Sequence, residues 1–229
     1  MDSAGKKNMK NTFLRPEDAW WPALPGHWSL LPNRAVFHER IERCADDEQM
    51  LSVTIERGVI QQADLLEGTW RKDSSNDDRS NYKVVHAEDI VYNKMRMWQG
   101  AIGFSPKRGI VSPAYVVLTT NIDINTKYYH YLFRTPTFAR VSYKYSYGIC
   151  DDMLSLRYED FKTIYIPVPP KKEQDSIVAF IENKMAQIDD YRALQSRITG
   201  VAVSLSERQN SLIEELRRTL IYEAVFGGH

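Results

Sequence analysis

The sequence predicts an α+β protein, with a β-rich globular domain followed by a long C-terminal helix that forms a coiled coil. Two observations support this prediction. Before position 168, short runs rich in Val, Ile, Tyr and Thr alternate with glycine-containing turns, as is typical of strands. From Lys171 to Val225 there is no proline and only one glycine, Gly200, and apolar residues recur mostly every three or four positions, which is the helix period.

The N-terminal residues 1–18 are expected to form a flexible tail. They carry positive charge but lack the apolar core of a secretory signal. No run of about 18 apolar residues occurs in the chain, so no membrane span and no membrane partner is expected. Cys44 and Cys150 could form one disulfide, but two buried thiols in a reducing cytoplasm are favoured.

The β-rich domain is expected to span residues 19–168. The predicted strand runs are 51–55, 83–94, 100–104, 114–120, 128–133 and 162–168. Residues 125–140 fit both the strand and the helix period, so a helix is also plausible there, and Pro136 is expected to break it.

Lysine and arginine are unevenly distributed, although the net charge is zero. Residues 79–148 hold 10 Lys and Arg against 3 Asp and Glu, and they contain nine of the thirteen tyrosines. A basic stretch interleaved with aromatic residues is typical of nucleic-acid binding. A tyrosine-rich β domain with scattered surface lysines explains the same composition, and composition alone does not separate the two.

A rigid joint is expected where the β-rich domain meets the helix. Pro169 and Pro170 stiffen the chain, and proline is favourable at the first position of a helix. Glu173, next to Gln174, falls in the first turn, where a negative charge is stabilised. We therefore expect no flexible linker between the two parts.

Residues 169–229 are expected to form the helix. A continuous helix of about 50 residues would rise about 75 Å, so it needs another helix beside it to bury its apolar stripe. The predicted buried seam consists of Ile188, Tyr191, Leu194, Ile198, Leu205, Leu212 and Leu216. Gly200 could divide the region into a hairpin of two helices. A continuous helix is favoured, because Gly200 lacks the Pro, Asn or Asp that usually accompanies a turn.

Several kinds of catalytic chemistry have no motif in this chain. There is no G-x-G for a nucleotide turn, no C-x-x-C and no G-x-S-x-G, and the five histidines have no partner at metal-ligand spacing. Neither catalysis nor a bound metal or cofactor is therefore expected in this chain.

Four stretches resemble the specificity subunits of type I restriction-modification enzymes. They are LPGHWSLLPNRAVF (24–37), EDIVYNKMRMWQGAIGF with GIVSPAYVVL (88–104 and 109–118), CDDMLSLRYEDFKTIYIPVPPKKEQDSIVAFIENKMAQID (150–189) and EELRRTLIYEAVFG (214–227). The Pro-Pro-x-x-Glu-Gln pattern that ends at Gln174 is the most specific part of the resemblance.

The resemblance implies a non-catalytic subunit of the prokaryotic cytoplasm that reads double-stranded DNA and holds methyltransferase and restriction subunits. S-Adenosylmethionine, ATP and magnesium would belong to those partner subunits. Complete members have two recognition domains and two long helices, whereas this sequence has one of each. It is therefore expected to be a half-subunit, natural or truncated, that pairs with a second copy through the helix and reads a split palindrome.

Ten residues are predicted to contact DNA. They are Lys94, Arg96, Gln99, Lys107, Arg108, Arg140, Ser142, Lys144, Tyr145 and Ser146. Lys94 and Arg96 are expected to contact phosphates or to form structural pairs, and Lys107 and Arg108 to contact phosphates from a tight turn. Met97 and Trp98, which lie between Arg96 and Gln99, are expected to be core residues.

The stretch RVSYKYSYG (140–148) is the favoured reader of base edges. In an extended strand or loop its cationic and hydroxyl side chains would share one face, and its mostly aromatic side chains the other. A half-buried strand without DNA contacts fits the stretch equally well.

Two other functions fit the sequence less well. The chain could be a structural adaptor whose helix dimerises and whose β domain binds a protein, or a fragment of a fused restriction-methylation enzyme. Salt-dependent binding to duplex DNA would distinguish the DNA reader from the adaptor.

Overall fold

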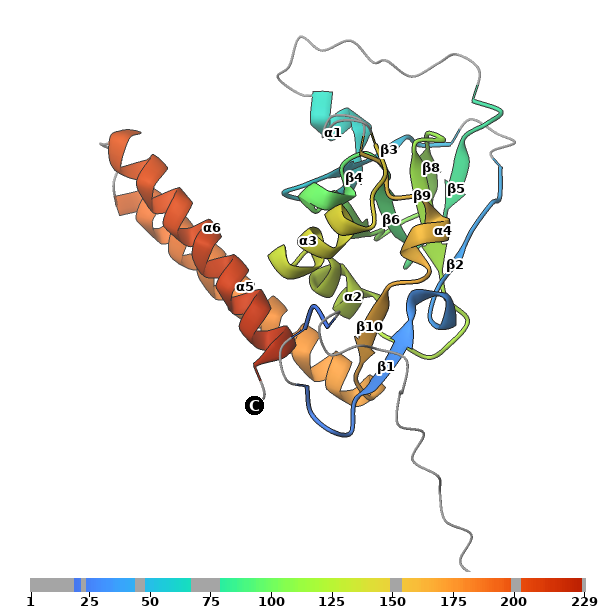
Figure 1. Ribbon diagram of the computed structural model, residues 1–229. Helices are drawn as coiled ribbons and strands as arrows, with labels where there is room; N and C mark the ends of the chain where they lie inside the picture. The colour runs from blue at the N-terminus through green and yellow to red at the C-terminus, as the bar shows by residue number, and fades with distance from the viewer. Residues whose placement is uncertain are drawn as a thin grey trace, which may run out of the picture.

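A computed structural model describes residues 19–21, 24–43, 48–66, 79–148, 154–198 and 203–227. Figure 1 shows a domain of small sheets and short helices, from which a pair of long helices projects as an arm. This arrangement confirms the predicted α+β class. No helix within the described ranges is both long enough and apolar enough to cross a membrane. The expected tail over residues 1–18, Cys44 and Cys150 lie outside these ranges.

Four antiparallel strands form the central sheet, in the order β2 (His38–Glu39), β9 (Tyr115–Thr119), β6 (Ile90–Asn93) and β7 (Ile102–Phe104). Successive side chains of a strand point to opposite faces. Accordingly, Ile90 and Tyr92 enter the main core, whereas Val91 enters a second core on the other face. The sheet is therefore buried on both sides.

Smaller elements surround this sheet. The two-stranded sheets pair β1 (Ser29–Pro32) with β10 (Tyr165–Val168), β3 (Leu51–Thr54) with β4 (Gly58–Gln61), and β5 (Lys83–Val85) with β8 (Gly109–Val111). The short helices are η2 (Asn33–Ala35), α1 (Gln62–Leu66), η3 (Met97–Gln99) and α4 (Tyr158–Phe161). The β1–β10 pair joins the beginning of the domain to the strand that leads into the arm.

Two further helices, α2 (Thr126–Phe133) and α3 (Pro136–Lys144), contribute to the main core. The hydroxyl of Thr135 accepts a hydrogen bond of 3.2 Å from the backbone N–H of Phe138, which caps α3. Pro136 occupies the first turn, where its missing N–H costs nothing. The expected helix with a break at Pro136 is confirmed, whereas the predicted strand at 128–133 is wrong, because that run belongs to α2.

The predicted extended strand at residues 140–148 is wrong for its first five residues, because α3 continues to Lys144. Phe138, Val141 and Ser142 are buried, which is the i, i+3, i+4 pattern of a helix. The alternation of polar and apolar residues also fits a strand. However, Thr135 caps a helix that begins at Pro136 and continues through residues 140–144. Tyr147 makes an isolated antiparallel bridge with Ser155.

The arm consists of two helices, α5 (Lys171–Ile198) and α6 (Val203–Phe226). They run antiparallel, since Arg192 lies 3.2 Å from Glu214 and Arg217 pairs with Asp189. The favoured continuous helix is therefore wrong, and the hairpin is what the structure has. Gly200 lies between the helices, outside the described residues. Folding back lets the C-terminal part of the apolar side of α6 pack against the rest of the chain.

The end of α6 returns to the domain. Ala224, Val225 and Phe226 are buried in the main core, and the Phe226 ring lies 6.0 Å from the indole of Trp20. The helix pair is therefore fixed to the domain at both the start of α5 and the end of α6.

Candidate nucleic-acid interface

The η3 loop and α3 lie against each other at one end of the central sheet. The rings of Trp98 and Tyr143 meet edge to face, with their centroids 5.9 Å apart. Beneath them Met97 is completely buried, as expected for a core residue, whereas Trp98 remains partly exposed. This contact brings together residues that the sequence places 45 positions apart.

The η3 loop is a tight turn between β6 and β7 that presents side chains to solvent. Gly100 ends it with φ of 86°, a left-handed conformation that glycine adopts at little cost. Met95 and Arg96 are exposed, and the Arg96 guanidinium donates to the side-chain oxygen of Gln99 at 3.1 Å. The indole N–H of Trp98 donates to the Met95 carbonyl at 3.1 Å, which fixes the ring.

Lys94 is held at the end of β6. Its backbone N–H donates to Ala114 and its carbonyl accepts from Leu156 at 2.9 Å. Burial lowers the pKa of the Lys94 ammonium, and the positive charges of Lys83 and Arg157 add to this effect. The carboxylate of Glu39 acts in the opposite direction. The side chain is thus a partly buried cation, which contact with an anion would stabilise.

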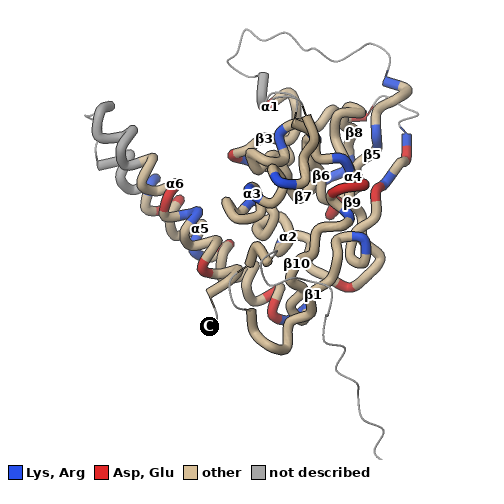
Figure 2. Tube along the Cα trace, viewed as in Figure 1, with Lys and Arg blue, Asp and Glu red and all other residues tan. Residues whose placement is uncertain are grey.

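One side of α3 is cationic and aromatic. Arg140, Tyr143, Lys144 and Tyr147 are exposed, and their spacing places them on one helical face and its continuation. Figure 2 shows lysines and arginines over this part of the domain, around α3, β6 and β7. From 124 to 150 the chain has four Lys and Arg and no Asp or Glu. This face can therefore receive a polyanion with little repulsion.

Ser142 is not on this face, and its predicted DNA contact is wrong for this structure. Its side chain is fully buried. The hydroxyl of Ser146 donates to the Ser142 carbonyl at 2.7 Å, closing the end of α3. Tyr145, the residue that follows α3, is partly buried against the main core. Because the backbone is helical here, Tyr145 and Ser146 lie at the C-terminal end of α3 and cap it.

Lys107 and Arg108 lie at the opposite end of β7 from η3. The guanidinium of Arg108 is occupied by Glu48, at 2.8 Å, and lies 3.2 Å from the ring nitrogen of His86. A phosphate would have to compete with that carboxylate for Arg108. The ten predicted contacts thus do not form one surface, and the η3–α3 group is the larger.

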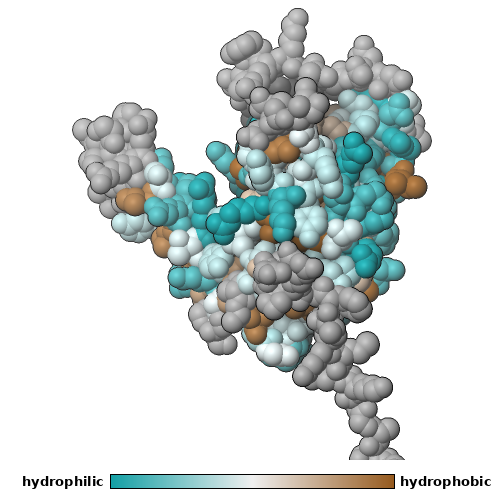
Figure 3. All heavy atoms as spheres, in the orientation of Figure 1, coloured by the Kyte–Doolittle hydropathy of each residue, from teal (hydrophilic) through white to brown (hydrophobic). Residues whose placement is uncertain are grey.

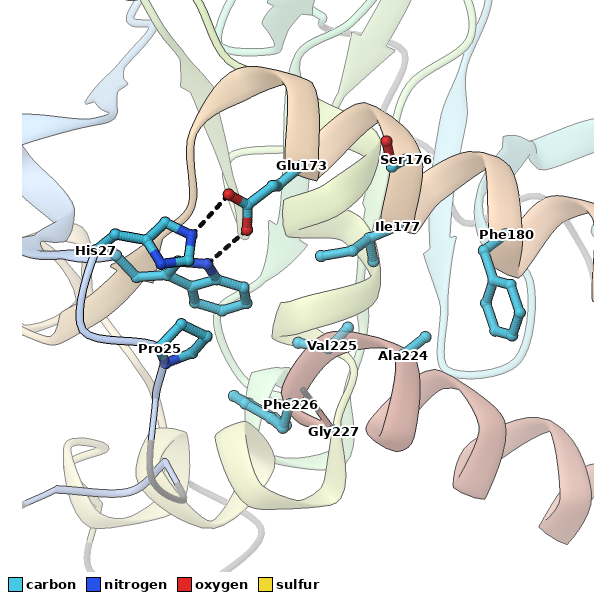
Figure 4. A pocket seen from close by; sticks show the side chains of 11 residues that line it. Pro25, His27, Glu173, Ser176, Ile177, Phe180, Ala224, Val225, Phe226 and Gly227 are labelled. Carbon is cyan, nitrogen blue, oxygen red and sulfur yellow. Dashed lines mark hydrogen bonds and ion pairs between the residues drawn. The ribbon is translucent and has the colours of Figure 1, made fainter. Parts of the chain in front are cut away.

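The joint is tied to the domain by Glu173 and Gln174. Figure 4 shows His27 hydrogen-bonded to the Glu173 carboxylate, at 2.7 Å. The Trp28 indole donates to the other oxygen of this carboxylate at 2.8 Å. These bonds, chiefly the one from Trp28, lower the pKa of Glu173. Beside them the end of α6 borders an apolar cavity of about 360 Å³ that Phe180 also lines.

The predicted seam residues are only partly covered in the hairpin. Ile188 is half-buried, but Tyr191, Leu212 and Leu216 are 58%, 57% and 52% exposed. The side chains of Leu194, Ile198 and Leu205 lie outside the described residues. Figure 3 shows the arm standing apart from the domain across a hollow. Part of the arm therefore presents apolar side chains to solvent.

Sequence reasoning missed Tyr143, Tyr147 and Met95 as exposed apolar residues of this site. The spacing of Arg140, Tyr143 and Tyr147 is helical and could have indicated one face of a helix. Within the residues described, no group of His, Cys, Asp and Glu could hold a metal ion.

Similar folds occur among solved structures. A chain from a study entitled "Structural basis underlying complex assembly and conformational transition of the type I R-M system" has a TM-score of 0.51 and 13% identity, over 90% of this chain and 47% of that one. The HsdS subunit of Thermoanaerobacter tengcongensis gives 0.48 and 13%, over 90% and 46%. The S subunit of a type I restriction-modification system from M. genitalium gives 0.42 and 16%, over 82% and 49%. This chain spans about half the length of each.

None of the curated proteins compared matches the sequence. A family model does match it, the one described as "Type I restriction modification DNA specificity domain", over residues 62–199. That range is more than half of the 229 residues and contains both η3 and α3. The chain therefore belongs to the family of type I restriction-modification DNA specificity domains.

Proposed function

We propose that this protein is the DNA-reading, non-catalytic subunit of a type I restriction-modification system, acting in the cytoplasm. The observation that carries the proposal is the η3–α3 face, where exposed cations surround exposed aromatic rings inside the region that matches the family. Cations bind the phosphates of any duplex, whereas side chains at the base edges discriminate between sequences.

We assign Lys94 and Lys107 to contacts with the DNA phosphates, and Arg140 and Lys144 to contacts with the base edges. The first pair lies at the two ends of the β6–β7 region, and the second pair projects from the exposed side of α3. Changing either member of the first pair to Ala should weaken binding to all duplexes about equally and reduce the salt slope by about 1. Changing either member of the second should weaken the cognate duplex more than random DNA.

Fluorescence anisotropy over a salt series, with a cognate and a random duplex, measures both effects. Lys172→Ala is the matched control, because Lys172 is an exposed cation in the first turn of α5, on the arm rather than on the η3–α3 face. Equal losses on both duplexes for all four variants would refute the division into backbone and base contacts. Binding that does not respond to salt would refute the DNA-reading function itself.

We also propose that two copies pair through the arm and together read a split palindrome. The ion pairs Asp189–Arg217 and Arg192–Glu214 set the register of the hairpin, so Tyr191 lies at the level of the two exposed leucines of α6. A second copy would cover these side chains. Two copies related by a two-fold axis would then supply two reading domains that face opposite directions.

Sedimentation at micromolar concentration tests the pairing. Leu216→Glu should convert a dimer to a monomer with little loss of thermal stability, because Leu216 is 52% exposed within one chain. Thr219→Glu, at an exposed polar position of the same helix, is the control. A wild-type protein that sediments as a monomer would refute the dimer.

A double variant, Asp189→Cys with Arg217→Cys, then reports how the helices pair. Oxidation should join the two cysteines within one chain if the hairpin persists in the dimer. A covalently linked dimer would show instead that α6 packs on α5 of the other copy.

The same arm is proposed to hold the methyltransferase and restriction subunits. S-Adenosylmethionine, ATP and magnesium would bind to those subunits. Its exposed apolar residues and the missing catalytic motifs support this assignment. Co-expression with the methyltransferase gene adjacent in the source genome should give a complex that methylates DNA at one bipartite sequence. The methylated sequence would give the target and its symmetry. Methylation at the same sites without this chain would contradict the assignment.

A further inference from the structure

Large apolar side chains are exposed together at the junction of η3 and α3. Met95 is 49% exposed, Tyr143 47% and Tyr147 69%, and the Trp98 ring is packed against Tyr143. Trp98 also donates to the Met95 carbonyl, so these residues form one patch. Tyr147 lies just beyond the end of α3, and its backbone is hydrogen-bonded to Ser155, whose neighbour Leu156 donates to the carbonyl of Lys94. Clustered exposed apolar residues mark an interaction site.

The charges around this patch indicate what it binds. Arg96, Arg140 and Lys144 are exposed beside the rings, and the acid-free segment 124–150 includes all of α3. A partner that is both anionic and locally apolar therefore fits. Duplex DNA has both properties in its major groove, where phosphates flank the methyl groups of thymine.

The shape of the patch agrees with that groove. A helix is about 10–12 Å across with its side chains, and the major groove is about 12 Å wide. On α3, Tyr143 projects between Arg140 and Lys144, at i+3 and i−1 relative to them. Two cations thus stand beside one aromatic ring on the exposed side of the helix.

We infer that Tyr143 is a specificity-determining residue that contacts a thymine methyl group through its ring, with Trp98 as the residue that positions it. This inference rests on the proposed function, and it adds the DNA group that α3 would recognise, the thymine methyl. The Trp98 indole is fixed by its bond to Met95 and meets Tyr143 at an interplanar angle of 73°. A ring that is held before binding loses less entropy when the complex forms.

The experiment begins with the full chain and a pool of randomised duplexes. Duplexes that the wild type enriches are resynthesised with deoxyuridine in place of each thymine in turn, which removes only the methyl group. At one position, or at its symmetric pair, uracil should weaken wild-type binding about fourfold, the effect expected for one buried methyl-sized group. All other positions should show no change.

Variants then identify the side chain. Tyr143→Ala should weaken binding and abolish the uracil effect, whereas Tyr143→Phe should preserve both. Trp98→Leu should reduce the uracil effect while leaving the salt slope unchanged, a result that a loss of folding would not produce. Ile122→Ala is the control, because Ile122 is an exposed apolar residue in the loop between β9 and α2, at the end of the central sheet away from η3. Melting temperatures should stay near the wild-type value, since Tyr143 is half exposed.

Each other result overturns the inference in a distinguishable way. A loss with Tyr143→Phe as large as with Tyr143→Ala would mean that the hydroxyl makes the contact. A uracil effect that persists in Tyr143→Ala would assign the methyl contact elsewhere. Unchanged DNA binding with lost methyltransferase binding would make the patch a protein contact. If the wild type enriches no duplex, the proposed function fails as well; if it enriches duplexes that are insensitive to uracil, only this inference fails.

Discussion

The side-chain amide of Gln174, in the first turn of α5, donates a hydrogen bond of 2.8 Å to the carbonyl of Pro169. Its oxygen accepts one of 2.8 Å from the backbone N–H of Asn125, the residue that caps α2. Gln174 is 1% exposed. One buried amide thus connects the end of the domain, the start of the arm and the α2 cap.

Removing this amide should destabilise the protein. Gln174→Ala would leave two backbone groups without partners, at a cost of about 1–3 kcal/mol each when buried. Urea unfolding should show a reduced free energy of unfolding. The control, Lys172→Ala, should change it by less than about 0.5 kcal/mol, because Lys172 is exposed. A Gln174→Ala protein as stable as the control would show that the connection contributes nothing.

Softening the joint should affect the distance between half-sites rather than folding. Pro169→Gly with Pro170→Gly restores backbone freedom just before α5. The double variant should melt as a folded protein and bind duplexes over a wider range of spacer lengths than the wild type. Binding to a series of split sites with one base pair added or removed at a time measures this. An unchanged spacer preference would mean that the prolines only mark the start of the helix.

His130 should make the protein less stable in acid. Its ring nitrogen Nδ1 accepts from the backbone N–H of Phe104, which requires that nitrogen to be unprotonated. Burial, with the nearby charges of Arg134 and Lys127, lowers the pKa of His130 to about 3. Below about pH 6.5 the unfolded chain therefore takes up the proton first, and stability falls by at most about 1.4 kcal/mol per pH unit until the folded pKa is reached.

Thermal melting between pH 7.5 and pH 4.5 measures this loss. His130→Asn keeps an acceptor at the same place but does not titrate, so its stability should depend less steeply on pH than that of the wild type. Equal slopes for the two proteins would show that other groups cause the acid sensitivity.

The burial of the C-terminal end of α6 should contribute about 3 kcal/mol to the free energy of unfolding. Phe226 is buried against Trp20 and Tyr222, so Phe226→Ala should lower the free energy of unfolding by about 3 kcal/mol. The exposed neighbour Glu223→Ala is the control. A cost below about 1 kcal/mol would indicate that the end of α6 does not pack on the domain in solution.

The class of the fold and the start of α5 could be predicted from the sequence, because both depend on local periodicity and on proline. The hairpin was one of the two arrangements that the sequence allowed, but it could not be favoured, since the apolar period continues on both sides of Gly200. The preference for the folded-back form comes instead from burying Phe226 against Trp20, which is 206 residues away in sequence.

The candidate site was predictable in composition but not in geometry. The basic, tyrosine-rich segment is visible in the sequence, whereas the contact between Trp98 and Tyr143 and the pairing of Arg108 with Glu48 join distant parts of the chain. Ser142 was misassigned because polar residues at every second position suit a strand, while the Thr135 cap decides for a helix.

One side of α3 packs on the core and the other faces solvent. Phe138 and Val141 hold the helix on the core, while Arg140, Tyr143 and Lys144 face outward and contribute little to that attachment. Exchanging the outward residues should therefore alter which bases are preferred at almost no cost to folding. If the proposed function holds, single substitutions on this helix would change the DNA target of a lineage while the core beneath the helix remains the same.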